Sequence, residues 1–213
     1  MALGLVAGAC GGGHTVTNSA NGPRATVGLY GPLAPALLTQ TQLRQVPSLS
    51  TATVRPLSQA KVFNDPDPRG PCGAKVPVVP LTDANGVAIK AASGIAAAEL
   101  VTRLAPGAAK AYLDARMADT TDGCPEYETV SKHNVTQRTL LVRIVRLHKD
   151  LQQGLAVVLG IKISGSVRAV TEIEVRDGDV LARTILFSAA PLDDAVPRGI
   201  ASLMGQDLAS LDN

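Results

Sequence analysis

Aromatic side chains are scarce in this chain: its 213 residues include no tryptophan, two phenylalanines and three tyrosines. A protein that holds bases or sugars usually stacks them on several rings, so a stacking platform is not expected. The net charge is only +2 and the basic residues are scattered. A nucleic-acid-binding domain carries such residues clustered on one face. The composition therefore argues against nucleic acid as a partner.

Long apolar runs and catalytic motifs are also missing. No stretch of 18 or more apolar residues occurs, so no segment as written is expected to span a bilayer as a helix. Neither Gly-x-Ser-x-Gly nor His-Glu-x-x-His is present. His14, His133 and His148 do not stand near a serine or cysteine in the pattern of a triad. The Asp-Pro-Asp sequence at 65–67 lacks the glutamate that closes an EF-hand loop. We therefore expect no enzymatic activity, no metal and no cofactor.

The three cysteines, Cys10, Cys72 and Cys124, differ in their surroundings. In an exported protein, an odd number indicates one bonded pair and one cysteine with another fate. Cys72 ends a proline-rich loop and Cys124 follows a predicted helix, so a structural disulfide between them is the expected pairing. A redox role or a zinc site is a weaker alternative, because the chain has no Cys-x-x-Cys spacing.

The segment before Cys10 is short and apolar, as the hydrophobic region of a signal peptide would be. "Val-Ala-Gly-Ala-Cys" resembles a bacterial lipobox, in which small residues allow cleavage and the cysteine thiol carries diacylglycerol. Ala7 stands where leucine is usual, and no Lys or Arg precedes Cys10, which favours a true start further upstream. We interpret residues 1–10 as a signal-peptide remnant and Cys10 as the lipidation site. A free thiol on a disordered leader is the alternative.

Residues 11–34 are rich in Gly, Ser, Thr, Asn and Pro, with little apolar periodicity. Such a segment buries too little surface to offset its ordering entropy and is typical of a flexible tether. Residues 35–213 are then the folded domain. Together with Cys10, this predicts a protein anchored by lipid to the outer face of the cell membrane.

Three helices are predicted in the folded part. Thr39 is a candidate N-cap with Gln42 as its capping-box partner, which indicates a short helix over 40–46. Apolar residues at helical spacing predict a second helix over 107–118. The third helix, over about 195–211, begins beside acidic residues that suit a helix N-terminus.

Strands make up most of the rest. The run 51–63 contains Pro56, which removes a ladder donor and favours an edge strand. Turn signals divide the alanine-rich stretch 86–104 into two strands rather than helices. Five more β-rich runs follow, at 127–131, 139–149, 155–164, 166–177 and 179–189. We therefore expect an α+β fold with a cleft, in which a central antiparallel sheet of about five to seven strands is flanked by two or three helices.

Three features of the later strands refine this picture. The Asp-Gly pair at 177–178 predicts a hairpin. Thr171, Ile173 and Val175 alternate with charged residues, which predicts one solvated sheet face. The runs "LLVRIV" and "LAVVLGI" are apolar on both faces, as in central strands.

The order of these features resembles a known family. It comprises a Leu-Leu-Thr helix start, a strand, a proline-rich loop ending in Cys72, an alanine-rich helix ending at Cys124, several strands with the hairpin "RDGDVLARTILF", and the helix "AVPRGIASLMGQDLASL". Over residues 33–211 it resembles the extracellular sensor domain of mycobacterial PknH-type serine/threonine kinases, which also occurs in actinobacterial lipoproteins. The resemblance implies an exported α+β domain, a ligand-binding cleft and a Cys72–Cys124 bridge. The second disulfide of the kinase domains has no counterpart, because no cysteine follows Cys124.

Arginines on the predicted strands are the candidate ligand-binding residues. Gathered on one sheet face they would line an anion-binding cleft, for example for a phosphorylated lipid or a wall fragment; alternatively, they form a solvated face paired with Glu172, Glu174 and Asp177. The candidates are Arg143, Arg146, Arg168 and Arg183, with Arg138 nearby in sequence. The predicted function is a non-catalytic, sensor-like domain that binds a small ligand or an envelope protein. A carrier for lipid or glycolipid and an envelope hydrolase are the alternatives.

Overall fold

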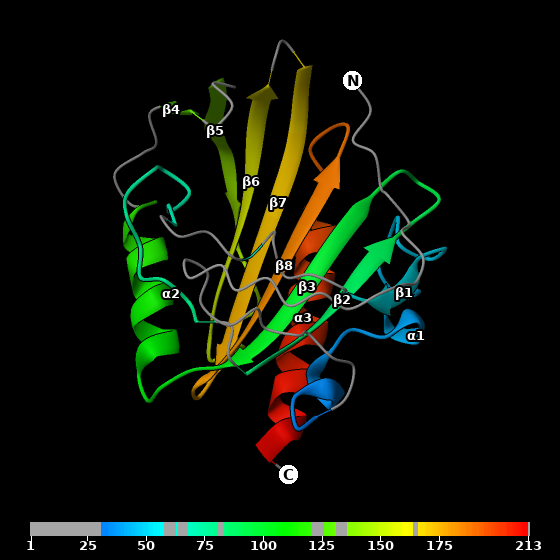
Figure 1. Cartoon of the computed structure of the whole chain (residues 1–213). Coiled ribbons are helices and arrows are strands. Elements are labelled where there is room, and N and C mark those ends of the chain that lie inside the picture. The colour runs from blue at the N-terminus through cyan, green and yellow to red at the C-terminus, as the bar shows by residue number, and fades with distance from the viewer. Residues whose placement is uncertain are drawn as a thin grey trace, which may run out of the picture.

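The computed structural model describes residues 31–57, 63, 68–80, 83–120, 126–130, 136–163 and 166–212. A single eight-stranded sheet dominates it, with every pair of neighbouring strands antiparallel (Figure 1). The strand order is β1-β2-β3-β8-β7-β6-β5-β4. The predicted α+β class with a central antiparallel sheet is confirmed.

The elements have the following bounds. The strands are β1 Thr53–Pro56, β2 Ala84–Lys90, β3 Ala96–Arg103, β4 Tyr127–Val130, β5 Thr136–Val145, β6 Gln153–Ile163, β7 Ser166–Asp177 and β8 Val180–Ser188. The helices are α1 Gln40–Leu43, α2 Ala108–Ala118 and α3 Ala195–Ala209, with short 3-10 helices η1 Ala34–Ala36 and η2 Ser210–Asp212.

Local signals in the sequence explain several of these elements. Thr39 accepts a hydrogen bond from the backbone of Gln42, whose side chain accepts one from the backbone of Thr39, so the expected capping box opens α1. This helix is one turn long and ends at Leu43, earlier than expected. Gly178, at φ 52°, begins the two-residue turn of the expected β7–β8 hairpin.

Both faces of the sheet are buried, which corrects the prediction of one solvated face. One core lies between the sheet and α3, η1 and α1, while a second lies between the other face and α2 with residues of the 57–79 segment (Figure 1). The alternation in β7 is real, but Glu174 is only 2% exposed. Its charge is balanced by buried partners instead of by water, which the sequence pattern alone does not distinguish.

The expectation for "LLVRIV" as a central strand is also wrong. This run lies in β5, which is separated from the sheet edge only by the four-residue strand β4. Leu140, Val142 and Ile144 are 46%, 44% and 45% exposed. The run "LAVVLGI" in β6 fits the expectation better, since Leu155 to Leu159 are buried.

The predicted signal-peptide remnant and most of the tether lie outside the described residues, as does Cys10. Among the helices that the structure describes, none combines the length and apolarity needed to cross a membrane.

Candidate functional site

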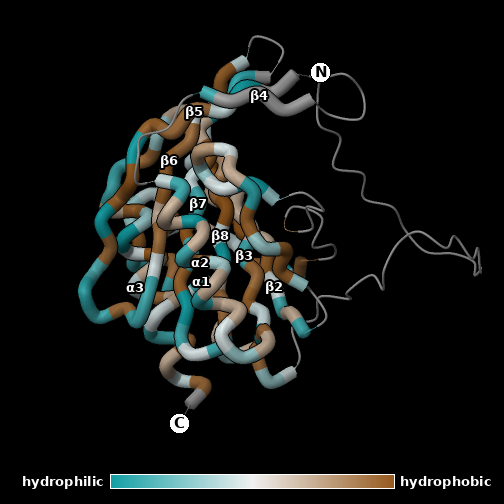
Figure 2. The backbone as a smooth tube through the Cα atoms, turned by 90° about the vertical axis from the view of Figure 1, so that its left-hand side faces the viewer, coloured by the Kyte–Doolittle hydropathy of each residue, from teal (hydrophilic) through white to brown (hydrophobic). Residues whose placement is uncertain are grey.

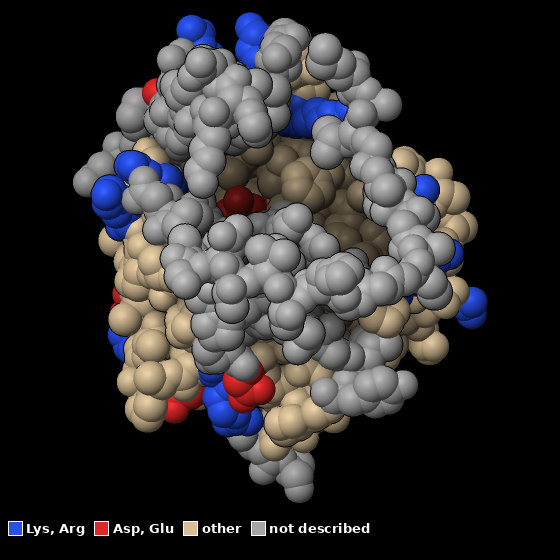
Figure 3. Space-filling model, viewed as in Figure 1, with Lys and Arg blue, Asp and Glu red and all other residues tan. Residues whose placement is uncertain are grey.

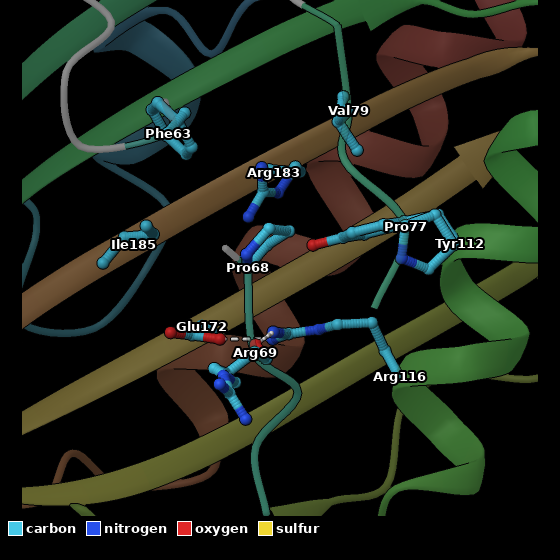
Figure 4. Close-up of a pocket in the computed structure, with 10 residues that line it drawn as sticks. All are labelled: Phe63, Pro68, Arg69, Pro77, Val79, Tyr112, Arg116, Glu172, Arg183 and Ile185. Carbon is cyan, nitrogen blue, oxygen red and sulfur yellow. Dashed lines mark hydrogen bonds and ion pairs between the residues drawn. The ribbon is translucent and has the colours of Figure 1, made fainter. Parts of the chain in front are cut away.

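A pocket opens on the sheet face that carries α2. Its volume is about 110 Å³, and its walls come from α2, β7, β8 and the segment before β2 (Figure 4). A space-filling view of this face shows a hollow with an acidic side chain in its depth (Figure 3). The lining residues are Phe63, Pro68, Arg69, Pro77, Val79, Tyr112, Arg116, Glu172, Arg183 and Ile185.

Glu174, beside the pocket, is the centre of a buried hydrogen-bond network. Its Oε1 accepts from the Tyr112 hydroxyl at 2.6 Å and from Arg183 Nε at 3.1 Å, while its Oε2 accepts from Arg116 Nε at 2.8 Å. Burial alone would raise the pKa of this carboxyl. The positive charges of Arg116 and Arg183 oppose burial, and the pKa of Glu174 lies below its usual value.

Arg116 is held on three sides. Besides its bond to Glu174, its Nη2 donates to Glu172 Oε2 and its Nη1 donates to the Arg69 carbonyl at 3.0 Å. Burial would lower the pKa of Arg116, but Glu174 and Glu172 raise it well above its ordinary value. The guanidinium is thus permanently charged, and each of its three nitrogens donates a hydrogen bond to a protein group.

Arg183 differs from Arg116 because only its Nε donates a hydrogen bond to a described residue. Its guanidinium lies over two rings, with Cζ 5.4 Å from the Phe63 centroid and 5.2 Å from the Tyr112 centroid. The side chain is 13% exposed and lines the pocket (Figure 4). The terminal nitrogens make no hydrogen bond to the described part of the chain, so they are open to a ligand.

Tyr112 completes the network as a hydrogen-bond donor. Burial first, and then the nearby Glu174 carboxylate, raise the pKa of its hydroxyl above the ordinary value. The phenol is therefore neutral across the physiological range. It cannot act as a base, but it holds Glu174 in place.

The other predicted arginines do not gather around this pocket. Arg143 lies on the opposite face, where its Nε donates to Asp194 Oδ1 at 2.8 Å and its Nη2 donates to the Leu192 carbonyl. Arg146 is exposed near the end of β5, and Arg168 is exposed near the start of β7. Arg138 pairs with Glu126 at 3.7 Å and is about half exposed. Of the four candidates, Arg183 alone lines the pocket.

Cys72 sits in a turn that is tied to the end of α2. Its backbone N–H donates to Asp119 Oδ2 at 2.6 Å, and the N–H of Ala74 donates to Asp119 Oδ1 at 3.2 Å. Cys124, the expected partner, lies outside the described residues, so the bridge stays a prediction. The link to Asp119 holds Cys72 near the helix end from which the chain continues to Cys124.

The sequence alone did not single out Phe63, Tyr112 or Arg116. Phe63 and Tyr112 are two of the five aromatic residues in the chain, and their scarcity is the one available signal. Arg116 faces the sheet from a helix whose other charged residues, Lys110 and Asp114, are exposed. Nothing in its local sequence distinguishes it from Lys110, which pairs with Asp114 at the surface.

Comparisons with known proteins give a structural likeness only. No family model matches the chain, and no curated protein matches it. Among solved structures, the chain is similar to the extracellular domain of PknH from Mycobacterium tuberculosis, with a TM-score of 0.52 and 10% sequence identity. The alignment covers 83% of this chain and 93% of that domain. The fold of this chain therefore resembles that of the extracellular domain of PknH.

Proposed function

We propose that this protein is a lipid-anchored, extracytoplasmic, sensor-like domain that binds a small anionic ligand in the pocket beside α2. The observation that carries the proposal is the Arg183 guanidinium, positioned by Glu174 and by two aromatic rings while its terminal nitrogens face the pocket. A planar guanidinium whose terminal nitrogens bond to no described residue matches the geometry of a carboxylate or a phosphate.

The charges around the pocket support an anionic ligand. Arg69, Arg116 and Arg183 line it, against the carboxylates of Glu172 in the wall and Glu174 beneath. The balance leaves one excess positive charge. The remaining walls are apolar and include the Phe63 ring, so the ligand we expect carries an apolar group beside its anionic group.

The two other functions receive less support. A carrier for lipid or glycolipid needs a cavity for acyl chains, whereas this pocket of about 110 Å³ holds only a small group. A hydrolase needs a nucleophile and a base within reach of each other. The pocket lining contains no serine, threonine, cysteine or histidine among its described residues. His148 is exposed and lies beside Asp150, away from this lining.

Binding can be tested by NMR titration of the ¹⁵N-labelled full chain with acetate, hexanoate and inorganic phosphate. We expect saturable shifts at the pocket, and tighter binding of hexanoate than of acetate because of the apolar walls. Arg183→Met should abolish the shifts and Arg183→Lys should weaken binding, since a lysine keeps the charge but loses the two-pronged donor. Arg168→Met is the matched control and should bind as the parent does.

Thermal unfolding of each variant shows whether the fold survives. If folded Arg183→Met bound the anions as tightly as the parent, the pocket would not be the site. Absence of saturable binding by all three anions would count against an anion-binding pocket.

The lipid anchor has a separate test, because it depends on Cys10 and not on the pocket. Mass spectrometry of protein extracted from its native envelope should find an N-terminal Cys10 carrying diacylglycerol. An unmodified Met1 would contradict the anchor and leave the pocket proposal untouched.

A further inference from the structure

The sheet face that α3 packs against is left open at one end. There the beginning of β5, the end of β6 and the beginning of β7 extend beyond the helix, with hydrophobic positions interspersed among polar ones (Figure 2). Leu140, Val142 and Val167 are 46%, 44% and 65% exposed. This area is called the β5–β7 tip and consists of Arg138, Leu140, Val142, Gly160, Lys162 and Val167.

The strand register brings these residues together. Leu140 lies opposite Gly160, and Arg138 lies opposite Lys162, which in turn lies opposite Val167. Gly160 has no side chain, and a Cβ at its position would lie 3.6 Å from Val142 Cγ2. The aliphatic side chains therefore form one surface with a row of two cations at its outer border.

The cations at this end have few acidic partners. Lys162 makes no ion pair with a described residue, and neither does Arg168, which follows Val167 and points to the other sheet face. Arg138 forms an ion pair with Glu126, with Nη1 3.7 Å from Oε1, and lies opposite Glu128 in the pairing of β4 with β5. Lys162 thus borders the aliphatic side chains without an acidic partner among the described residues, and Arg138 stands opposite it in the strand register.

We infer that the β5–β7 tip docks onto the surface of an anionic lipid bilayer. Aliphatic side chains enter the boundary between head groups and acyl chains, while neighbouring Lys and Arg contact lipid phosphates. The charges argue against a second copy of the chain as the occupant, because symmetric pairing of this surface would bring like charges together. The inference goes beyond the proposed function and requires neither the lipid on Cys10 nor a ligand in the pocket.

Co-sedimentation of the full chain with vesicles tests this inference. One vesicle set is pure phosphatidylcholine and the other contains 30% phosphatidylglycerol. We expect binding to the anionic set only, weakening as salt increases. Lys162→Gln should lower the partition coefficient by about fivefold, the effect of one cation near the surface, whereas Arg168→Gln, on the other sheet face, should lower it less. Val167→Ser should also lower it.

Two substitutions serve as matched controls. Lys149→Gln removes an exposed lysine beyond the other end of β5, and Val78→Ser removes a valine that is 59% exposed on a different segment. Both should bind vesicles as the parent does. Equal binding to the two vesicle sets, equal binding by all variants, or no binding would overturn the inference. So would a dimer in light scattering that Val167→Ser converts to a monomer.

Discussion

The backbone N–H of Leu38 donates a hydrogen bond to Oε2 of Glu99 over 2.8 Å, although 61 positions separate the two residues in the chain. Glu99 lies on β3 and is fully buried, and its Oε1 has no hydrogen-bond partner among the described residues. Burial raises the pKa of Glu99 to about 8, although the bond from Leu38 acts in the opposite direction. A protonated carboxyl therefore ties the segment between η1 and α1 to the centre of the sheet at neutral pH.

This arrangement predicts that stability falls as pH rises. The folded protein holds the Glu99 proton up to about pH 8, whereas the unfolded chain releases it near 4.5. The stabilisation is complete below 4.5 and is lost through pH 8, on the order of 5 kcal/mol in total. Burial also raises the pKa of Asp207, which adds to the same trend.

Urea unfolding at pH 5, 7 and 9 measures this effect. Glu99→Gln should remove most of the decrease, because an amide keeps the acceptor for Leu38 and has no proton to lose. Glu126→Gln, a change at an exposed carboxylate, should leave the slope as in the parent. A parent protein equally stable at pH 5 and pH 9 would contradict the prediction.

The network around Glu174 predicts a large cost for removing Arg116. Arg116→Met leaves the carboxylates of Glu172 and Glu174 without the cation that they share, and the free energy of unfolding should drop by about 3–5 kcal/mol. Arg138→Met removes an exposed pair and should cost no more than about 1 kcal/mol. Chemical unfolding of both variants at neutral pH makes the comparison. A similar small loss for both would mean that the buried network contributes little.

The turn held by Asp119 predicts that Cys72 pairs with Cys124. Peptide mapping without reduction should recover one linked peptide that contains both, and Cys10→Ser should not change it. Reduction should destabilise the domain by about 4 kcal/mol in the chain-entropy picture. Recovery of a Cys10–Cys72 peptide instead would rule out this pairing.

Replacing Gly178 in the β7–β8 turn should lower stability through the backbone conformation alone, with no steric clash. Its φ is 52°, and a Cβ at this position would have no neighbour within 4 Å. Gly178→Ala should therefore cost about 1 kcal/mol through left-handed backbone strain alone. Gly160→Ala, whose Cβ would make an ordinary contact with Val142, is the matched control and should not destabilise. Thermal unfolding that gave equal losses would refute the distinction.

Short-range patterns were enough to predict most of the elements. The Thr39–Gln42 capping box and the Asp-Gly hairpin depend on residues a few positions apart, so the sequence contains the whole interaction. The same holds for the separation of β2 from β3 by turn residues. The odd number of cysteines also indicated a bonded pair, of which Cys72 is described and Cys124 lies outside the described residues.

These short-range patterns could not predict which residues far apart in the chain contact each other. Whether Glu174 faces water or a buried arginine depends on where α2 packs, and α2 is 58 positions away along the chain at Arg116. Arg183 and Arg143 both stand on strands, yet the register sends one to the pocket and the other to the opposite face. An alternation of apolar and polar residues along a strand shows that they point to opposite faces of the sheet. It does not show which segment covers each face.

By itself, the sequence determined the helices, the strands and the scarcity of rings, because each follows from neighbouring residues or from counting. Only the tertiary structure decided that both sheet faces are buried and that Arg183 lies between Phe63 and Tyr112, its terminal nitrogens unbonded to any described residue. It also left Leu140 and Val167 exposed. The physical reason is that burial and charge pairing depend on segments far apart in the chain, which meet only when the sheet and helices pack.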